Sequence, residues 1–160
     1  MKTEEEMKNL IVDQLAAFDQ LYREMDEIYH IYAKSCGISD TSMWLLYSLY
    51  LNDGTYTQKE LYSVWHYPPQ TVNSCLKNFE KQGIIKLEAV PGNRKNKLVA
   101  LTEKGKDESR RIIARLIGAE QRACADMGAK EMQTLLSLTG KYTELLRSEV
   151  DQISDISSKE

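Results

Sequence analysis

Residues 57–101 decide the fold, and they read TQKELYSVWHYPPQTVNSCLKNFEKQGIIKLEAVPGNRKNKLVAL. The stretch predicts two short helices, over residues 58–65 and 68–83, because an N-cap threonine opens the first and a proline pair opens the second. From residue 84 apolar and charged side chains alternate with the period of a strand, which predicts a β-hairpin up to residue 101. The hairpin tip is basic and contains a glycine: Gly92-Asn93-Arg94-Lys95-Asn96-Lys97.

Long amphipathic helices flank this stretch. Apolar residues at helical spacing predict one helix over 8–36, capped by Gly37, and a second helix that starts at Ser39 or Asp40. Beyond the hairpin, a helix capped by Thr102 runs to about Met127, and another follows Gly128. The predicted architecture is mainly α with a small β-hairpin wing, in the order α-α-α-α-β-β-α-α, which is a winged helix-turn-helix with additional terminal helices.

The predicted organisation is a single unit over residues 1–160. The winged lobe occupies 39–104, helices for dimerisation occupy 8–36 and 105–153, and 154–160 form a frayed tail. The acidic start, Glu4-Glu5-Glu6, is expected to be solvated and disordered.

Composition excludes several classes of protein. The 160 residues are 42% hydrophobic and 28% charged, the apolar runs are too short for a membrane span, and the acidic start is not a signal peptide. Three cysteines far apart favour a reducing cytoplasm over a disulfide framework. Two histidines, with no nucleophile–base pairing and no phosphate-binding loop, predict no catalytic residues, no metal and no cofactor, and therefore no enzyme.

Charge and polarity mark the middle of the chain as a candidate surface for double-stranded DNA. The whole chain carries −3, yet eight Lys and Arg against four Glu give residues 57–104 a charge of +4. The outer face of the 68–83 helix carries short polar side chains and one cation, which suit hydrogen bonding to bases and phosphates. The candidate DNA-binding residues are Gln70, Thr71, Asn73, Ser74, Lys77 and Asn78 on this helix, and Asn93, Arg94, Lys95 and Lys97 on the wing.

The apolar stripes of the flanking helices exceed what a small winged lobe can cover. Such helices usually bury the surplus against a second copy, so we expect a homodimer. A symmetric dimer places its two copies of the 68–83 helix, the reading helix that would enter the major groove, about 34 Å apart. It would therefore recognise a near-palindromic operator.

The chain resembles the MarR family of bacterial transcriptional regulators over nearly its full length. The family's run T-Q-K-E-L-A-x-x-L-G-L-S-x-x-T-V aligns without a gap with residues 57–72, and its L-E-x-x-G-L-I aligns with residues 79–85. After the wing, its D-x-R and V-x-L-T-x-x-G align with Asn93-Arg94-Lys95 and with residues 99–105. The resemblance implies an obligate homodimer, a reading helix in the major groove, Arg94 near the minor groove, and release of DNA by a small, often phenolic, effector.

Three departures from the family pattern limit what can be transferred. Asn93 replaces the wing aspartate, which weakens any salt bridge that orients Arg94. His66 replaces a turn glycine and must adopt a conformation that glycine takes freely. Ser74 replaces a frequent arginine, which removes one phosphate or guanine contact.

Other functions remain open at this point. Tyr29, Tyr32 and Trp44 are candidates to line a pocket for an aromatic effector, with core packing as the alternative. Cys36 is a candidate redox sensor, although its place at a helix C-terminus opposes a low thiol pKa. A winged-helix dimer that binds proteins instead of DNA is a further alternative.

Overall fold

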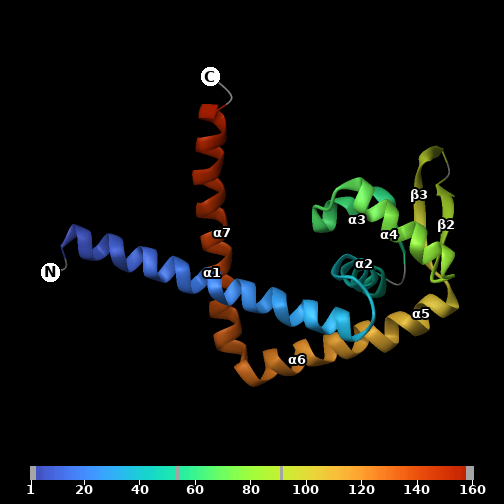
Figure 1. Ribbon diagram of the computed structural model, residues 1–160, viewed down its shortest axis with the longest axis horizontal. Helices are drawn as coiled ribbons and strands as arrows, with labels where there is room; N and C mark the ends of the chain where they lie inside the picture. The colour runs from blue at the N-terminus through green and yellow to red at the C-terminus, as the bar shows by residue number, and fades with distance from the viewer. Residues whose placement is uncertain (1–2, 53–54, 91, 158–160) are drawn as a thin grey trace. The chain divides into compact units, whose positions relative to one another are not determined.

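The computed structural model describes residues 3–52, 55–90 and 92–157, without the side chains of residues 55, 93–95 and 155–157. The chain divides into two compact units, Met1–Ala114 and Arg115–Glu160. The first unit contains, in chain order, α1 (Glu4–Ser35), α2 (Asp40–Leu51), β1 (Thr55–Thr57), α3 (Gln58–Trp65), α4 (Pro69–Lys81), β2 (Ile85–Val90), β3 (Asn93–Leu101), α5 (Glu103–Ser109) and the π-helical turn η1 (Arg110–Ala114) (Figure 1). The second contains α6 (Arg115–Met127) and α7 (Ala129–Ser157).

The start of α1 corrects the expectation of a disordered acidic end. Thr3 caps the helix: its hydroxyl accepts a hydrogen bond from the Glu6 amide, and its own amide donates to the Glu6 carboxylate at 2.7 Å. This capping box satisfies two amides that a helix start leaves unpaired. Acidic side chains in the first turn are also stabilised by the partial positive charge of the helix N-terminus. Helix α1 therefore begins at Glu4 and includes the acidic run.

The helix-turn-helix forms as the sequence predicts. Ser39 caps α2, and Thr57 caps α3 in a capping box with Glu60. Helix α4 begins at Pro69, where the proline ring costs no helical hydrogen bond. The buried side chains of these helices build the core of the first unit, together with residues from the sheet and from η1: Leu45, Leu46, Leu49, Leu61, Val72, Leu76, Phe79, Val99 and Ile113.

The sheet has one strand more than the sequence analysis predicted. Its antiparallel order is β1-β3-β2, with Tyr56 opposite Val99 and Leu87 also opposite Val99 on the other side. Strand β3 begins at Asn93 and not at Lys97, so most of the expected basic tip belongs to a strand. The hairpin of β2 and β3 lies beside α4 (Figure 1).

The single helix expected from Thr102 to Met127 is interrupted by η1. A π-helical turn widens the hydrogen-bond ladder by one residue and often marks a functional position. Here the Tyr32 hydroxyl donates to the Ile112 carbonyl at 2.6 Å, which ties α1 to η1. The hydroxyl of Ser109, just before this turn, is buried without a hydrogen-bond partner in the described part of the chain.

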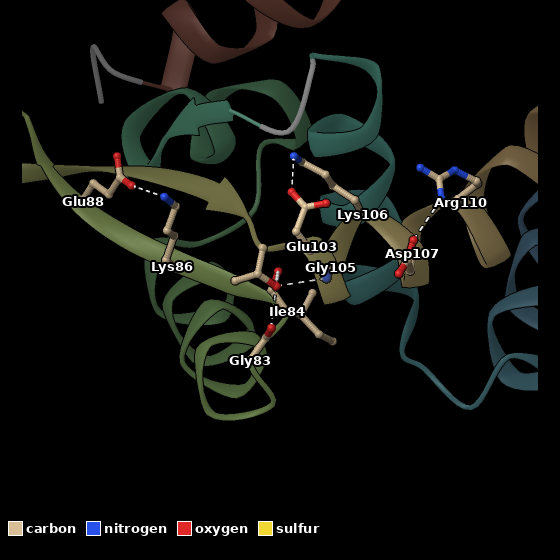
Figure 2. A network of polar contacts seen from close by, with 10 residues as sticks. Gly83, Ile84, Lys86, Glu88, Glu103, Gly105, Lys106, Asp107 and Arg110 are labelled. Carbon is tan, nitrogen blue, oxygen red and sulfur yellow. Dashed lines mark hydrogen bonds and ion pairs between the residues drawn. The ribbon is translucent and has the colours of Figure 1, made fainter.

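The joint between the wing and α5 explains the glycine in V-x-L-T-x-x-G. Thr102 caps α5 and donates its hydroxyl to the Gly83 carbonyl at 2.6 Å, so α5 is held against the end of α4. A Cβ at Gly105 would lie 1.9 Å from the Ile84 carbonyl oxygen, closer than any real contact. Figure 2 shows Gly83, Ile84 and Gly105 meeting at this joint.

Helix α7 continues to Ser157, so residues 154–157 are helical where a frayed tail was expected, and 158–160 lie outside the described residues. Across the described ranges, every helix is too short or too polar to serve as a membrane span.

Candidate nucleic-acid interface

Helix α4 presents most of the predicted reading residues to solvent. Gln70, Thr71, Ser74, Lys77 and Asn78 are exposed on one side, whereas Val72, Leu76 and Phe79 are buried on the other. Within the described chain, Asn78 accepts a hydrogen bond from Gln82 at 3.1 Å, and the other four make no polar side-chain contact. Because the hydrogen-bonding groups of these four side chains are unengaged among the described residues, they are available to an external partner.

Asn73 differs from its neighbours on α4. It is half-buried on the side of the helix that faces α3. Its Oδ1 accepts hydrogen bonds from the Tyr62 hydroxyl at 2.8 Å and from Nε2 of Gln58 at 3.4 Å. The sequence analysis named Asn73 but missed Tyr62 and Gln58. The one feature of the sequence that could have indicated their contact with Asn73 is that their helix, α3, is separated from α4 by only a short turn.

The wing is anchored to the helix-turn-helix at the start of α3. The Lys59 amide donates to Oδ1 of Asn96 on β3 at 3.3 Å, and β1 pairs with β3 directly before α3. Lys97 is exposed on β3. The side chains of Asn93, Arg94 and Lys95 lie outside the described part of the structure, so their predicted roles remain predictions.

Two of the three predicted effector residues, Tyr29 and Trp44, lie in an aromatic cluster of α1, α2 and α3. The ring of Trp44 lies 4.8 Å from that of Tyr29, 5.6 Å from that of Tyr47 and 4.7 Å from that of Trp65. The Trp65 indole donates to the Ser48 hydroxyl at 2.6 Å. Tyr32 points its hydroxyl at the Ile112 carbonyl, so in this arrangement that hydroxyl already has a partner.

A separate cavity of about 430 Å³ opens on the opposite side of α2, among α2, α4 and α5. Ser39, Ser42, Gln82, Lys104 and Arg111 contribute its polar lining. Its two cations are engaged within the protein, since Lys104 donates to the Gln82 carbonyl at 2.7 Å and Arg111 pairs with Glu108 at 2.7 Å. The cavity therefore shows no unpaired charge that would select a ligand.

The three cysteines are free and occupy different environments. Cys36 caps the C-terminus of α1 and is half-buried, and Cys124 is exposed on α6. Cys75 packs toward α2, with its sulfur 3.2 Å from the Ser42 hydroxyl, and burial raises the pKa of its thiol. A raised pKa keeps Cys75 neutral and makes it a poor nucleophile.

Comparison with known proteins bears on the same segment. Residues 37–95 match the model of the MarR family. A search of curated proteins finds no match.

Solved structures of MarR family members share the fold along most of the chain. A regulator from Neisseria meningitidis superposes with a TM-score of 0.75 at 22% identity, over 87% of this chain and 97% of that one. A putative regulator from Listeria monocytogenes, solved in complex with a 26-mer DNA, gives 0.66 at 25% identity, over 84% and 89%. AbsC from Streptomyces coelicolor gives 0.69 at 15% identity, over 92% and 98%. The chain thus matches the MarR family model from α2 to the start of β3 and is similar in fold to MarR family regulators along most of its length.

Proposed function

We propose that this chain is a MarR family regulator and that it binds a specific sequence of double-stranded DNA through α4 and the wing. One observation carries the proposal: α4 presents an exposed row of polar side chains, four of which make no polar contact with the described residues, beside a hairpin whose sequence is basic. The related regulator from Listeria monocytogenes was solved with DNA, which supports the same use of the fold here.

We further propose that the binding form is a homodimer. Large apolar side chains are exposed along α1 in the first unit and along α7 in the second, for example Ile28 at 64% and Leu138 at 62%. Apolar faces of this length are normally covered, and a second copy of the chain covers them symmetrically. Two reading helices then meet two half-sites of a near-palindrome.

A small aromatic effector is proposed to control this binding. The cluster of Tyr29, Trp44, Tyr47 and Trp65 joins α1 to the helix-turn-helix through ring contacts. An aromatic molecule that inserted among these rings would favour one arrangement of α1 and α2 over another, and so shift DNA affinity. Both tryptophans of the chain lie in this cluster, so their fluorescence reports directly on such binding. A protein of this kind acts in the cytoplasm as a binding protein and not as an enzyme.

The proposal is tested by selecting duplexes from a random pool with the purified chain, followed by fluorescence anisotropy at increasing salt. We expect enrichment of a near-palindrome and a linear fall of log affinity with log salt concentration, because each phosphate contact releases counterions. A triple variant, Gln70→Ala, Ser74→Ala and Lys77→Ala, removes exposed groups of α4 and should lose the selected sequence without losing the fold. Absence of enrichment at low salt would contradict DNA recognition and leave the protein-binding alternative.

A further inference from the structure

The contact between α3 and Asn73 restricts which hydrogen-bonding groups of a DNA base this residue can contact. Two donors, the Tyr62 hydroxyl at 2.8 Å and Nε2 of Gln58 at 3.4 Å, converge on one end of the Asn73 amide. An amide oxygen accepts through two lone pairs, whereas an amide NH₂ only donates. In the structure the end of the amide that meets these two groups is Oδ1, and both of its lone pairs are used within the protein.

The other end of the amide is available. Among the described residues, Nδ2 of Asn73 has no hydrogen-bond partner, and it is absent from the buried polar atoms that lack one, so solvent reaches it. Asn73 precedes the exposed Ser74 by one residue and Lys77 by one helical turn. The NH₂ group thus lies at the edge of the surface that α4 offers to DNA.

A donor-only asparagine distinguishes between purines. Asparagine usually recognises adenine by accepting from N6 and donating to N7 at the same time. Guanine presents two acceptors in the major groove, O6 and N7, and no donor. When Oδ1 is occupied, adenine loses half of its usual contact, while guanine still offers two acceptors to the amide hydrogens.

We propose that Tyr62 and Gln58 position Asn73 as a hydrogen-bond donor that selects guanine over adenine at one base pair of each half-site. This inference rests on the proposed DNA-binding function and adds a specificity rule to it. Tyr62 stands where the family run quoted above has alanine, which has no hydroxyl and cannot donate a hydrogen bond to Asn73. Tyr62 is thus a positioning residue that acts on specificity through Asn73.

The first test removes both donors to Oδ1 of Asn73, the Tyr62 hydroxyl and the Gln58 amide. Duplexes are selected from a random pool with the wild-type chain, and the base pair read by Asn73 is located as the position whose preference disappears in Asn73→Ala. We expect guanine at this position in the wild type. In Tyr62→Phe combined with Gln58→Ala, the ratio of guanine to adenine affinity should fall by about tenfold, because Oδ1 becomes able to accept from adenine N6.

Tyr67→Phe is the matched control. This tyrosine lies in the turn between α3 and α4, and among the described residues its hydroxyl makes no hydrogen bond to Asn73. The control should leave the preference unchanged at every position. Circular dichroism and urea unfolding of each variant show that the compared proteins are folded.

A second variant keeps the Tyr62 contact and changes the group that faces DNA. In Asn73→Asp the carboxylate still accepts from Tyr62, but the donor is gone and an acceptor takes its place. Carboxylates accept from cytosine N4, so the preference at the same position should move from guanine to cytosine.

The outcomes separate this inference from the proposed function. A selected palindrome whose guanine preference is unaffected by Tyr62→Phe and Gln58→Ala would overturn the inference and leave DNA recognition standing. A uniform loss of affinity in Asn73→Ala, equal for all sequences, would make Asn73 a phosphate contact and would also overturn it. Absence of any selected sequence would overturn both.

Discussion

His66 is the residue at which the chain turns from α3 toward α4, and its backbone is left-handed, with φ 52° and ψ 28°. A residue with a Cβ pays about 1–2 kcal/mol for this conformation, and glycine does not. We therefore expect His66→Gly to raise the free energy of unfolding by about 1 kcal/mol, part of the gain being offset by the larger entropy of glycine in the unfolded chain. Urea unfolding at constant protein concentration measures the change.

His66→Ala is the control, because alanine keeps the Cβ and removes only the imidazole. Its stability should not exceed that of the wild type. An equal gain in both variants would place the strain in the side chain and contradict the backbone explanation.

Gly105 is the residue that allows α5 to approach the start of the hairpin. An added Cβ would lie 1.9 Å from the Ile84 carbonyl oxygen, a backbone atom that cannot rotate away. We expect Gly105→Ala to lower the free energy of unfolding by about 3 kcal/mol or more, since either the helix or the strand must move.

Gly140→Ala provides the matched comparison, because a Cβ at this position in α7 meets no atom within 4 Å. There the better helix propensity of alanine should stabilise the chain by about 1 kcal/mol. Equal effects of the two substitutions in urea unfolding would show that the contact at Ile84 does not constrain the fold.

At the scale of the element, the N-terminus of α3 depends on an ionised carboxylate. Hydrogen bonds from the backbone amide and the hydroxyl of Thr57 lower the pKa of Glu60. A lowered pKa in the folded state means that the stabilisation is present above the pKa of the unfolded chain and is lost as the pH falls through the folded value.

The corresponding prediction compares the wild type with Glu60→Gln between pH 7 and pH 3. Because the site is exposed, the wild type should be more stable by only about 0.5 kcal/mol at pH 7, and the difference should shrink as the pH falls below the usual range of glutamate. Glu80→Gln, on α4 and outside any capping box, is the matched control for the exchange of side chain. A gap that stayed constant down to pH 3 would rule out the ionised cap.

The wing is the second element with a testable role. Arg94→Ala should weaken binding to all duplexes and reduce the slope of log affinity against log salt by about one, as expected for one lost phosphate or minor-groove cation. Lys8→Ala, on α1, should leave the slope unchanged. Unchanged affinity in Arg94→Ala would place the wing outside the interface.

The sequence predicted those elements whose signals are local. Caps, prolines and glycines set the bounds of α3 and α4 to within a residue or two, and Gly37 and Gly128 mark breaks between helices with left-handed backbones. The short strand β1 was missed, because three residues form a strand only through pairing with β3, which is distant in the chain. The turn η1 was also missed, since nothing local in its sequence signals a widened hydrogen-bond ladder.

In the candidate site, too, features with local sequence signals were predicted and features that depend on contacts between distant segments were not. The period of α4 identified its exposed face, because burial on a helix repeats with its turn. The engagement of Asn73 by α3 could not be predicted, since it depends on how two helices cross. For the same reason the ring contacts of Trp44 with both α1 and α3 required the structure.

At the scale of the whole molecule, the exposed apolar faces of α1 and α7 lead to the last prediction. A stable interface buries about 1,200–2,000 Å² in total, and two long helices with large apolar side chains at 36–64% exposure supply surface of that kind. Sedimentation equilibrium should therefore give about twice the chain mass of 18.4 kDa. The pair Leu135→Glu and Leu138→Glu places charges on the apolar face of α7 and should shift the equilibrium to the monomer.

Dimerisation and DNA binding should fail together in that variant. A monomer contacts one half-site, so its affinity for the full palindrome should drop to that for a single half-site, whereas a dimer gains from both at once. Lys141→Glu introduces a charge of the same sign at a position of α7 that is already charged, and should leave the mass near twice 18.4 kDa. A folded monomer that bound the palindrome as tightly as the wild type would mean that one α4 and one wing supply all the contacts, and the spacing of two reading helices would then have no part in recognition.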